Sequence, residues 1–539
     1  MIFVYDLIGV GFGPSNLALS GALIEKRATS SNESEQSFRN TLFFEKQSSF
    51  KWHPGMLLPG AQMQISFLKD LAMLRSPQSP LTFVNYLHRH NRLSAFIDRG
   101  SFTPSRKEFA DYLEWAARYV KEHGVNVNYG QEVVTLDESD EGLITVTTRC
   151  TSNGQLNQFV TRNLVLSPGG SANIPDVLKP LLKDPSITDR STFLHSSEYK
   201  DRVVKLLNSV TSDKPMPLKI AVIGGGQSSA EVTINLRELL SNVPSGEDSA
   251  VGHQIDMLIR KGSLKPSDDS QFSNGIFAPE STHRWFNTCE QGRERLMAEY
   301  KDTNYSVVNS RTIAAVSTKF ILHEILYDQK IDDAIAARCP ASQKPSAPQI
   351  KIQSHTRIMP SRYDEESRTF TLSLKNSQSE KDLEDQTYDA IICATGYQRY
   401  SWIDMLRSSE RLSQRFGLDN DGSIRLVPSI QRAMYVVDER GDSFPNTPTR
   451  GSSAVMITTP ISSAGGEDIV QQQKPVNIYI TRRYRLLPTD STETKSEKAL
   501  KARIYIQGLE ETTHGLSDTL LSVISCRAGE IVDDLFTED

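Results

Sequence analysis

Hydrophobic and polar positions near the N-terminus follow the order strand, glycine turn, helix, strand. The pattern predicts a β-strand over residues 2–8, a glycine cluster over 9–13, a helix over 15–27 and a second strand over 41–45. In such a unit the glycines let the backbone approach a pyrophosphate, and the helix N-terminus provides N–H donors. We therefore expect a nucleotide site at this turn, formed by Gly9, Gly11 and Gly13.

The same order returns in the middle of the chain. A strand is predicted over 218–223, followed by glycines at 224–226, a helix over 228–241 and a return strand over 254–259. Two β-α-β units in one chain predict an α/β fold with two Rossmann-like parts, and hence two bound dinucleotides.

The residue that ends each unit predicts which nucleotide the unit prefers. Glu45 ends the first unit, where a carboxylate can accept hydrogen bonds from an unphosphorylated ribose, and the polar stretch 29–40 explains its long spacing from Gly9 as an inserted loop. Arg260, followed by Lys261, ends the second unit, and a guanidinium pairs with a 2′-phosphate. We expect FAD at the first unit and NADPH at the second. The alternative for Glu45 is a solvated carboxylate at the end of a strand, and the alternative for Arg260 and Lys261 is a basic pair on the surface.

Composition narrows the possible partners. Lys and Arg total 60 against 66 for Asp and Glu, so the formal net charge of -6 gives no reason to expect nucleic acid. No apolar stretch reaches the roughly 18 residues that a membrane span needs, and the start lacks a basic signal-peptide region, so we expect a cytoplasmic protein. The five cysteines form no CxxC pair, which disfavours a disulfide scaffold, a metal site and a dithiol redox centre.

Two further features are interpreted as scaffold or surface. Ser105 and Glu108 predict a capping box that opens an amphipathic helix, with Gly124 as its stop. The segments 443–475 and 488–499 are rich in Ser, Thr, Pro and charge, and we interpret them as surface insertions.

Short motifs in a fixed order then point to one enzyme family. They are Gly9-Val-Gly-Phe-Gly-Pro-Ser-Asn-Leu17, Phe50-Lys-Trp-His-Pro-Gly-Met56, Met63-Gln-Ile-Ser-Phe-Leu-Lys-Asp-Leu71, Asn85-Tyr86-Leu87, Lys265-Pro-Ser-Asp-Asp-Ser270, Thr303-Asn-Tyr-Ser-Val307, Ala394-Thr-Gly-Tyr397 and His514-Gly-Leu-Ser-Asp-Thr-Leu-Leu-Ser522. Together they resemble the microbial flavin-dependent amine N-hydroxylases of hydroxamate siderophore biosynthesis, the L-ornithine N(5)-monooxygenase and L-lysine N(6)-hydroxylase family, in its fungal branch. The resemblance spans most of the chain outside the insertions.

The resemblance implies two Rossmann-like dinucleotide-binding domains, for FAD and NADPH, and a small, mainly helical substrate domain. We expect the FAD-binding domain over 1–190 and 398–539, and the NADPH-binding domain over 191–258 and 315–397. The amino-acid substrate domain is then expected over 259–314.

The resemblance also implies which residues contact the cofactors. Besides the first glycine turn, the flavin set is Glu45, Trp52, His53, Gln64, Val133, Thr519, Leu520 and Leu521. The NADPH set is Gly225, Gly226, Gln227, Ser228, Arg260, Asn304, Tyr305 and Ser306. Gly225 stands where the family often has a larger residue.

A third implied set holds the amino acid, with Lys69 and Asn304 as catalytic residues. Its members are Lys69, Asn274, Gly275, Ile276, Phe277 and Ser522. A free amino acid presents a carboxylate, which the Lys69 cation can pair with, and an ammonium, which side-chain amides can satisfy.

The implied reaction converts L-ornithine to N(5)-hydroxyornithine. NADPH reduces FAD, O₂ adds to give a hydroperoxyflavin, and the neutral δ-amine attacks its distal oxygen. The amine has a pKa near the lysine value of about 10.4, and desolvation should lower it. No metal is needed, because the flavin carries the oxygen. The family resemblance also implies a homo-oligomer, specifically a homotetramer.

Three alternatives stay open at this point. The first is a lysine N(6)-hydroxylase of the same mechanism, since one methylene contributes only about 1–3 kcal/mol of discrimination. The second is a dithiol-disulfide flavin reductase, which the missing CxxC disfavours. The third is a flavoprotein-fold binding protein without turnover, which Arg260 and Lys69 disfavour. The sequence leaves open the role of the insertions and the siderophore pathway.

Overall fold

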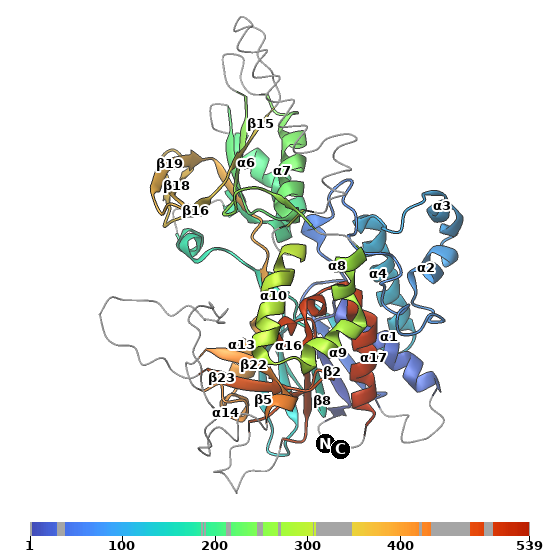
Figure 1. The fold of residues 1–539 in the computed structure, drawn as a ribbon. Coiled ribbons are helices and arrows are strands. Elements are labelled where there is room, and N and C mark those ends of the chain that lie inside the picture. Colours follow the sequence, from blue (N-terminus) through green and yellow to red (C-terminus); the bar gives the residue numbers. More distant parts are fainter. Residues whose placement is uncertain are drawn as a thin grey trace, which may run out of the picture.

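The fold of the chain was obtained as a computed structural model (Figure 1). It describes residues 3–29, 38–184, 187, 190–211, 217–244, 252–267, 271–304, 307–308, 348–419, 423–432, 475–489 and 500–537. Within these ranges no helix is both long and apolar enough to cross a membrane.

The first dinucleotide unit lies in a parallel five-stranded sheet. Its strands, in spatial order, are β25 (Arg503–Ile506), β8 (Asn163–Leu166), β2 (Leu7–Val10), β3 (Thr41–Glu45) and β4 (Asn126–Tyr129). Strands β2, β3 and β8 are buried along their whole length, as expected for a parallel sheet covered on both faces. This sheet and a second parallel five-stranded sheet, described below, confirm the predicted α/β class.

The expected strand over 2–8 is interrupted at Asp6. Residues Val4–Tyr5 form β1, which joins a separate sheet of order β1–β7–β6–β5, whereas the parallel strand β2 begins only at Leu7. The Asp6 carboxylate accepts the N–H of Asn40 at 3.1 Å, and its backbone carbonyl accepts from the amide of Asn163 at 2.8 Å. The strand is interrupted here because Asp6 bonds to Asn40, just before β3, and to the side chain of Asn163, the first residue of β8. The other strands of this sheet are β5 (Gln131–Glu138), β6 (Ile144–Cys150) and β7 (Leu156–Thr161).

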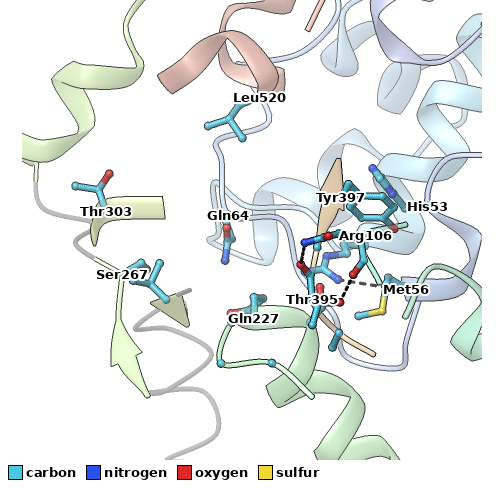
Figure 2. A pocket seen from close by; sticks show the side chains of 18 of the residues that line it. His53, Met56, Gln64, Arg106, Gln227, Ser267, Thr303, Thr395, Tyr397 and Leu520 are labelled. Atoms are coloured by element: carbon cyan, nitrogen blue, oxygen red, sulfur yellow. Dashed lines mark hydrogen bonds between the residues drawn. The ribbon is translucent and has the colours of Figure 1, made fainter. Parts of the chain in front are cut away.

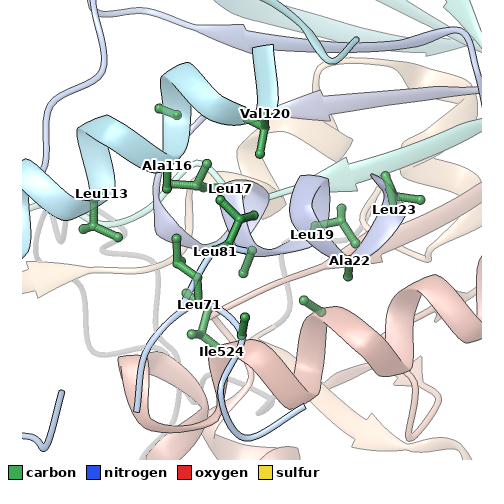
Figure 3. Close-up of a cluster of buried hydrophobic side chains, with 14 of the residues drawn as sticks. Leu17, Leu19, Ala22, Leu23, Leu71, Leu81, Leu113, Ala116, Val120 and Ile524 are labelled. Carbon is green, nitrogen blue, oxygen red and sulfur yellow. The ribbon is translucent and has the colours of Figure 1, made fainter. Parts of the chain in front are cut away.

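Three helices cover the first parallel sheet and share its largest core. They are α1 (Pro14–Thr29), α4 (Arg106–Glu122) and α17 (Ile524–Leu535). Their leucine, alanine and isoleucine side chains meet in one buried cluster, which Figure 3 shows between the three helices. The N-cap half of the predicted capping box is present, since the Ser105 hydroxyl accepts the N–H of Glu108 at 3.1 Å and helix α4 begins at Arg106. The Glu108 carboxylate lies instead near Arg92 and Arg99, at 3.9 and 3.7 Å.

The second dinucleotide unit lies in another parallel five-stranded sheet. Its order is β10 (Phe193–His195), β20 (Ala390–Cys393), β11 (Lys219–Ile223), β12 (Gln254–Leu258) and β15 (Gln349–Gln353). Helices α6 (Tyr199–Thr211) and α7 (Gln227–Leu240) pack on it. Three residues from the N-terminal part of the chain, Met56, Leu58 and Ala61, are buried in the same core. The two parallel parts are therefore joined by side chains as well as by backbone.

An antiparallel sheet between β15 and β20 was not part of the sequence prediction. It consists of β16 (Thr356–Ile358), β17 (Arg362–Asp364), β18 (Thr369–Asn376) and β19 (Asp382–Tyr388). Smaller ladders pair β9 (Ser171–Ala172) with β21 (Tyr397–Gln398), β13 (Lys265–Pro266) with β14 (Val307–Val308), and β23 (Val476–Ile480) with β22 (Ile424–Pro428) and β24 (Leu486–Leu487). Other, short α-helices are α2 (Phe83–Arg89), α3 (Leu93–Asp98), α5 (Lys179–Lys183), α13 (Ser401–Arg407), α14 (Glu410–Arg415) and α16 (Glu511–His514).

The segment expected to be a mainly helical substrate domain contains three α-helices in its described part, besides the short strands β13 and β14. It contains α8 (Gln271–Asn274), α9 (Pro279–Asn287) and α10 (Glu290–Asn304). Trp285 and Arg293 fix this segment to the C-terminal part, because both donate to the carbonyl of Thr512, at 3.4 and 3.0 Å. The exact limits of the three domains remain a prediction, and most of 443–475 and 488–499 lies outside the described residues.

Candidate active site

The first glycine turn lies between β2 and α1, as the sequence predicted. Gly11 has φ +78°, and a Cβ there would lie 2.4 Å from the carbonyl oxygen of Ser167. A Cβ on Gly9 would overlap the ring of Phe43, whereas one on Gly13 would meet no atom within 4 Å. The turn is thus shaped by two glycines that nothing larger can replace, while Gly13 borders open space at the start of a helix. This is a cradle of the kind that binds a pyrophosphate.

Asn16, which the sequence prediction did not include, holds this turn in place. Its side-chain nitrogen donates to the carbonyl of Gly11 at 2.7 Å and to that of Val10 at 3.3 Å. Its side-chain oxygen accepts from Gln507 at 3.0 Å and from the hydroxyl of Ser167 at 3.3 Å. Asn16 is fully buried, so these contacts satisfy its amide and link the turn to the ends of β8 and β25.

Glu45 is buried at the end of β3, so the alternative of a solvated carboxylate is wrong. One carboxylate oxygen accepts the N–H of Phe12 at 2.9 Å, and the other accepts the N–H of Gln47 at 3.0 Å. Each oxygen still has a second lone pair for a ligand hydroxyl. Its contact with a ribose stays a prediction.

The second glycine turn has the same position between β11 and α7. Gly224 has φ +141°, and a Cβ there would lie 2.3 Å from the carbonyl oxygen of Ala394. A Cβ on Gly225 would instead make an ordinary 3.5 Å contact with Ile259. The turn itself therefore does not demand glycine at position 225, where the family resemblance suggests a larger residue.

A cavity of about 1520 Å³ lies between the second unit, the segments around Gln64 and Arg106 that follow the first unit, and the helical segment. Figure 2 shows side chains from several elements around it, with Gln64 between Leu520 above and Gln227 below, and Thr303 at the left of the view. The predicted site residues that line it are Trp52, His53, Gln64, Lys69, Gly225, Gly226, Gln227, Ser228, Arg260, Asn274, Phe277, Leu520, Leu521 and Ser522. Residues more than 450 positions apart in the chain thus surround one space.

Other predicted residues lie outside the cavity lining or outside the described part. Gly9, Gly11, Gly13 and Glu45 form the first turn and its neighbouring strand end, while Val133 is buried in a core below the first sheet. The remaining ones that do not line the cavity are Thr519, Gly275 and Ile276. Tyr305, Ser306 and the side chain of Asn304 lie outside the described residues. The roles of all these residues stay predictions.

Lys69 reaches the cavity from a loop that its neighbour Asp70 fixes. The buried Asp70 carboxylate accepts the N–H groups of Ala72, Met73 and Phe83, at 2.8, 2.6 and 2.7 Å. Burial nevertheless raises the pKa of this carboxyl to about 6, because removal from water outweighs the three donors. Partial burial also lowers the pKa of the Lys69 ammonium. Lys69 is one of the residues that line the cavity.

Ser522 shows that the cavity is shaped for a polar ligand. Its side chain is 1% exposed and lines the cavity, and its hydroxyl has no hydrogen-bond partner among the described residues. A buried hydroxyl left unpaired is costly, at about 1–3 kcal/mol. A bound group that hydrogen-bonds to Ser522 would remove this cost. The residues around it therefore fit a cofactor and a polar substrate.

A family model described as L-lysine 6-monooxygenase/L-ornithine 5-monooxygenase matches residues 3–399. The chain belongs to this family. Among its curated relatives, an L-ornithine N(5)-monooxygenase from Omphalotus olearius is 50% identical, over 99% of this chain and 98% of the relative. One from Ceriporiopsis subvermispora is 45% identical, over 99% and 98%. The suspected family is confirmed.

Solved structures of the lysine/ornithine monooxygenase family have the same fold. The ornithine hydroxylase from Pseudomonas aeruginosa is 33% identical, with a TM-score of 0.69 over 99% of each chain. An ornithine N-hydroxylase from Kutzneria sp. 744, whose structure carries reduced FAD, NADP⁺ and L-ornithine, is 26% identical, with a TM-score of 0.68 over 99% of each chain. The predicted fold class is thus supported by both structures, and the second of them carries both nucleotides.

Arg106 and Tyr397 are among the cavity residues that the sequence prediction did not assign to the site. Arg106 was assigned to a scaffold helix, but the structure places it in the cavity wall, so that interpretation was incomplete. Tyr397 also lines the cavity and lies between two imidazoles, with ring centroids 5.7 Å from His53 and 5.4 Å from His195. The capping box had already placed Arg106 at the start of its helix. Nothing local shows which way its side chain turns.

His53, which lies beside Tyr397, has left-handed backbone geometry with φ 44°. Its ring is accessible from the cavity, yet the surrounding protein lowers its pKa to about 4, with further contributions from the guanidinium groups of Arg106 and Arg399. His53 is therefore neutral near pH 7 in this family member.

Proposed function

We propose that this chain hydroxylates the side-chain amine of L-ornithine to give N(5)-hydroxyornithine, with FAD as its bound cofactor. L-ornithine, O₂, NADPH and a proton are consumed, and N(5)-hydroxyornithine, water and NADP⁺ are formed. One oxygen atom enters the new N–O bond and the other leaves as water. The two electrons of NADPH balance the reduction of that second atom.

The observation that carries the proposal is the shared cavity. Its walls come from the second glycine turn, from the segment around Lys69 and from Ser522 near the C-terminus. An oxygenase needs its nicotinamide, flavin and amine in one water-restricted space, and this cavity can hold all three. A non-enzymatic binding protein has no need for a cavity that brings the second glycine turn together with Lys69 and Ser522.

We assign each cofactor to the unit whose geometry suits it. The first turn, Glu45 and the segment 519–522 would hold FAD, and the second turn with Arg260 would hold NADPH. FAD, when bound, takes a hydride from NADPH and delivers one oxygen atom of O₂ to the amine. The glycine geometry at Gly11 and Gly224 supports both assignments, since each allows backbone to approach a phosphate.

The remaining groups would hold the amino acid. In this proposal the Lys69 ammonium pairs with its carboxylate, Asn274 and Asn304 bind its polar ends, and Ser522 donates or accepts the hydrogen bond that it lacks. The reacting amine must be neutral to act as a nucleophile. Enclosure in the cavity lowers its pKa, because desolvation disfavours an ammonium.

Ornithine rather than lysine is favoured by the relatives at 50%, 45% and 42% identity, all named L-ornithine N(5)-monooxygenases. By family resemblance we further place the enzyme in the cytoplasm as a homotetramer. There it would catalyse the first step of hydroxamate siderophore biosynthesis.

Mass spectrometry of the products tests the proposal. The protein is incubated with FAD, NADPH and O₂, and with either ornithine or lysine in parallel. We expect a product 16 Da heavier than ornithine, in an amount that matches NADPH consumption, and little change of lysine. A hydroxylated lysine with unchanged ornithine would establish the alternative substrate, and NADPH consumption with H₂O₂ alone would contradict both.

A further inference from the structure

An ion pair connects the two dinucleotide units at the edge of the cavity. Arg106 at the start of α4 meets Glu231 on α7 through two hydrogen bonds, Nη1 to Oε2 at 2.7 Å and Nη2 to Oε1 at 3.0 Å. The side chains are 17% and 10% exposed. A paired, largely buried guanidinium and carboxylate of this geometry form a strong and directional contact. This pair therefore differs from the exposed ion pairs elsewhere on α4, such as that of Arg118 with Glu114.

Each partner of the pair is fixed to a different part of the molecule. Helix α4 packs with α1 in the core of the first sheet. The backbone N–H of Arg106 donates to Ala61 at 2.9 Å, and its Nη1 donates to the carbonyl of Met56 at 3.3 Å. Glu231 instead lies on the helix that follows the second glycine turn. The contact thus adds a directional link between the two parts to the one that Met56 and Ala61 already make in the core of the second sheet.

Glu231 also holds a side chain of the second turn itself. Its Oε1, which accepts from Arg106, accepts from Nε2 of Gln227 at 2.7 Å as well. Gln227 is the first residue of α7 and lines the cavity, as does Arg106 (Figure 2). One carboxylate oxygen therefore couples an arginine of the first unit to a nucleotide-contacting position of the second.

We propose that Arg106 and Glu231 form a positioning clamp that holds the bound nicotinamide nucleotide at the distance and angle needed for hydride transfer. The proposal rests on the cofactor assignment above. Neither residue needs to exchange a proton or an electron. The clamp acts through Gln227 and the first turn of α7, so its loss should slow hydride transfer more than it weakens nucleotide binding. A misplacement of about 1 Å can lower a rate by about 100-fold.

Glu231→Gln is the main test, because it keeps the shape and one acceptor oxygen but removes the charge. Reduction of the bound flavin by NADPH is followed without oxygen and without any amino acid, over a range of NADPH concentrations. We expect the limiting reduction rate to fall at least tenfold, while the Kd of NADP⁺ from calorimetry changes less than threefold. Amide hydrogen exchange in the first turn of α7 should become faster in the variant with FAD but no nicotinamide nucleotide.

Two further variants keep the outcome interpretable. Arg106→Lys retains the positive charge near His53 but cannot form the two-pronged contact, and we expect a smaller loss of the same kind. Glu114→Gln breaks the exposed pair on the same helix and should change none of these quantities. If Glu231→Gln fails to fold or to retain FAD, Arg106→Lys carries the test.

An unchanged reduction rate in Glu231→Gln would overturn the clamp. So would a weaker NADP⁺ affinity with an unchanged limiting rate, since that result describes a binding contact. Because no amino acid is present, the outcome is independent of whether ornithine is the substrate. Failure of wild-type protein to be reduced by NADPH would instead contradict the proposed function.

Discussion

The Glu45 carboxylate accepts the backbone N–H of Phe12 at 2.9 Å. Glu45 lies at the end of the buried strand β3, and Phe12 lies in the first glycine turn. We predict that Glu45→Ala lowers the stability of the flavin-free protein by about 1–3 kcal/mol, because the N–H groups of Phe12 and Gln47 lose their partner. FAD affinity should fall as well. Glu45→Gln, which keeps one acceptor oxygen, should lie between. Thermal unfolding of flavin-free protein and FAD titration measure both effects, and equal stability of Glu45→Ala and wild type would contradict the structural role.

Gly11 and Gly13 form a matched pair of substitutions. Gly11→Ala should destabilise the flavin-free protein by about 1–3 kcal/mol, because φ +78° and the Ser167 carbonyl oxygen at 2.4 Å oppose a side chain. Gly13→Ala meets no atom, so its flavin-free stability should match that of wild type. We expect it to lose FAD affinity nonetheless, since the added methyl would occupy the space proposed for the pyrophosphate. Normal FAD binding by Gly13→Ala would place the cofactor elsewhere.

Arg260 is predicted to select the phosphorylated nucleotide. Arg260→Ala removes a charge-assisted hydrogen bond of about 1.5–3 kcal/mol, so the Kd of NADPH should rise about 10- to 100-fold while that of NADH changes little. Arg362→Ala serves as the control, because Arg362 lies on β17 and does not line the cavity. The affinities are measured by calorimetry with NADP⁺ and NAD⁺. Equal losses for both nucleotides would argue against contact with the 2′-phosphate.

Lys69→Met tests the amino-acid site. The substitution keeps the length of the side chain but removes its charge, so the KM for ornithine should rise about tenfold or more. Flavin reduction by NADPH should be nearly unchanged, because the lost partner belongs to the amino acid. Lys107→Met, at an exposed position of α4, is the control. Slow reduction in Lys69→Met would assign the lysine to the nucleotide instead.

His514 is predicted to make the protein sensitive to acid. Burial lowers the pKa of this fully buried imidazole to about 3, against contributions from Asp518 that raise it. Between the ordinary pKa of 6.5 and about 3, the unfolded chain binds a proton here that the folded one does not. Stability therefore falls as pH falls through this window, by on the order of a few kcal/mol.

The pH dependence of urea unfolding tests this assignment. His514→Gln should unfold at a midpoint that depends less on pH between 6.5 and 4 than that of wild type. His123→Gln changes an exposed imidazole and should leave the dependence as it is. Parallel pH profiles of wild type and His514→Gln would contradict the role of His514.

Local patterns were enough for several parts of the fold. The two strand–glycine–helix units and the capping box at Ser105 follow from hydrophobic spacing and from residue types that contact their close neighbours in the chain. The strand over 2–8 was wrong in its extent, because Asp6 forms its bonds with Asn40 and Asn163, far along the sequence. The antiparallel strands β16–β19 were not predicted, because a short alternation of polar and apolar residues does not by itself distinguish a strand from a loop.

By itself, therefore, the sequence determined the family, the two nucleotide turns and many of the residues that line the cavity, since short motifs record contacts between close neighbours. The tertiary structure alone decided that Glu45 is buried against Phe12 and that Arg106 meets Glu231, 125 positions away. It also placed Met56 in the core of the second sheet. Such contacts depend on how two separately formed sheets pack, and hydrophobic periodicity specifies only which face of an element is buried, not the side chain that it will meet.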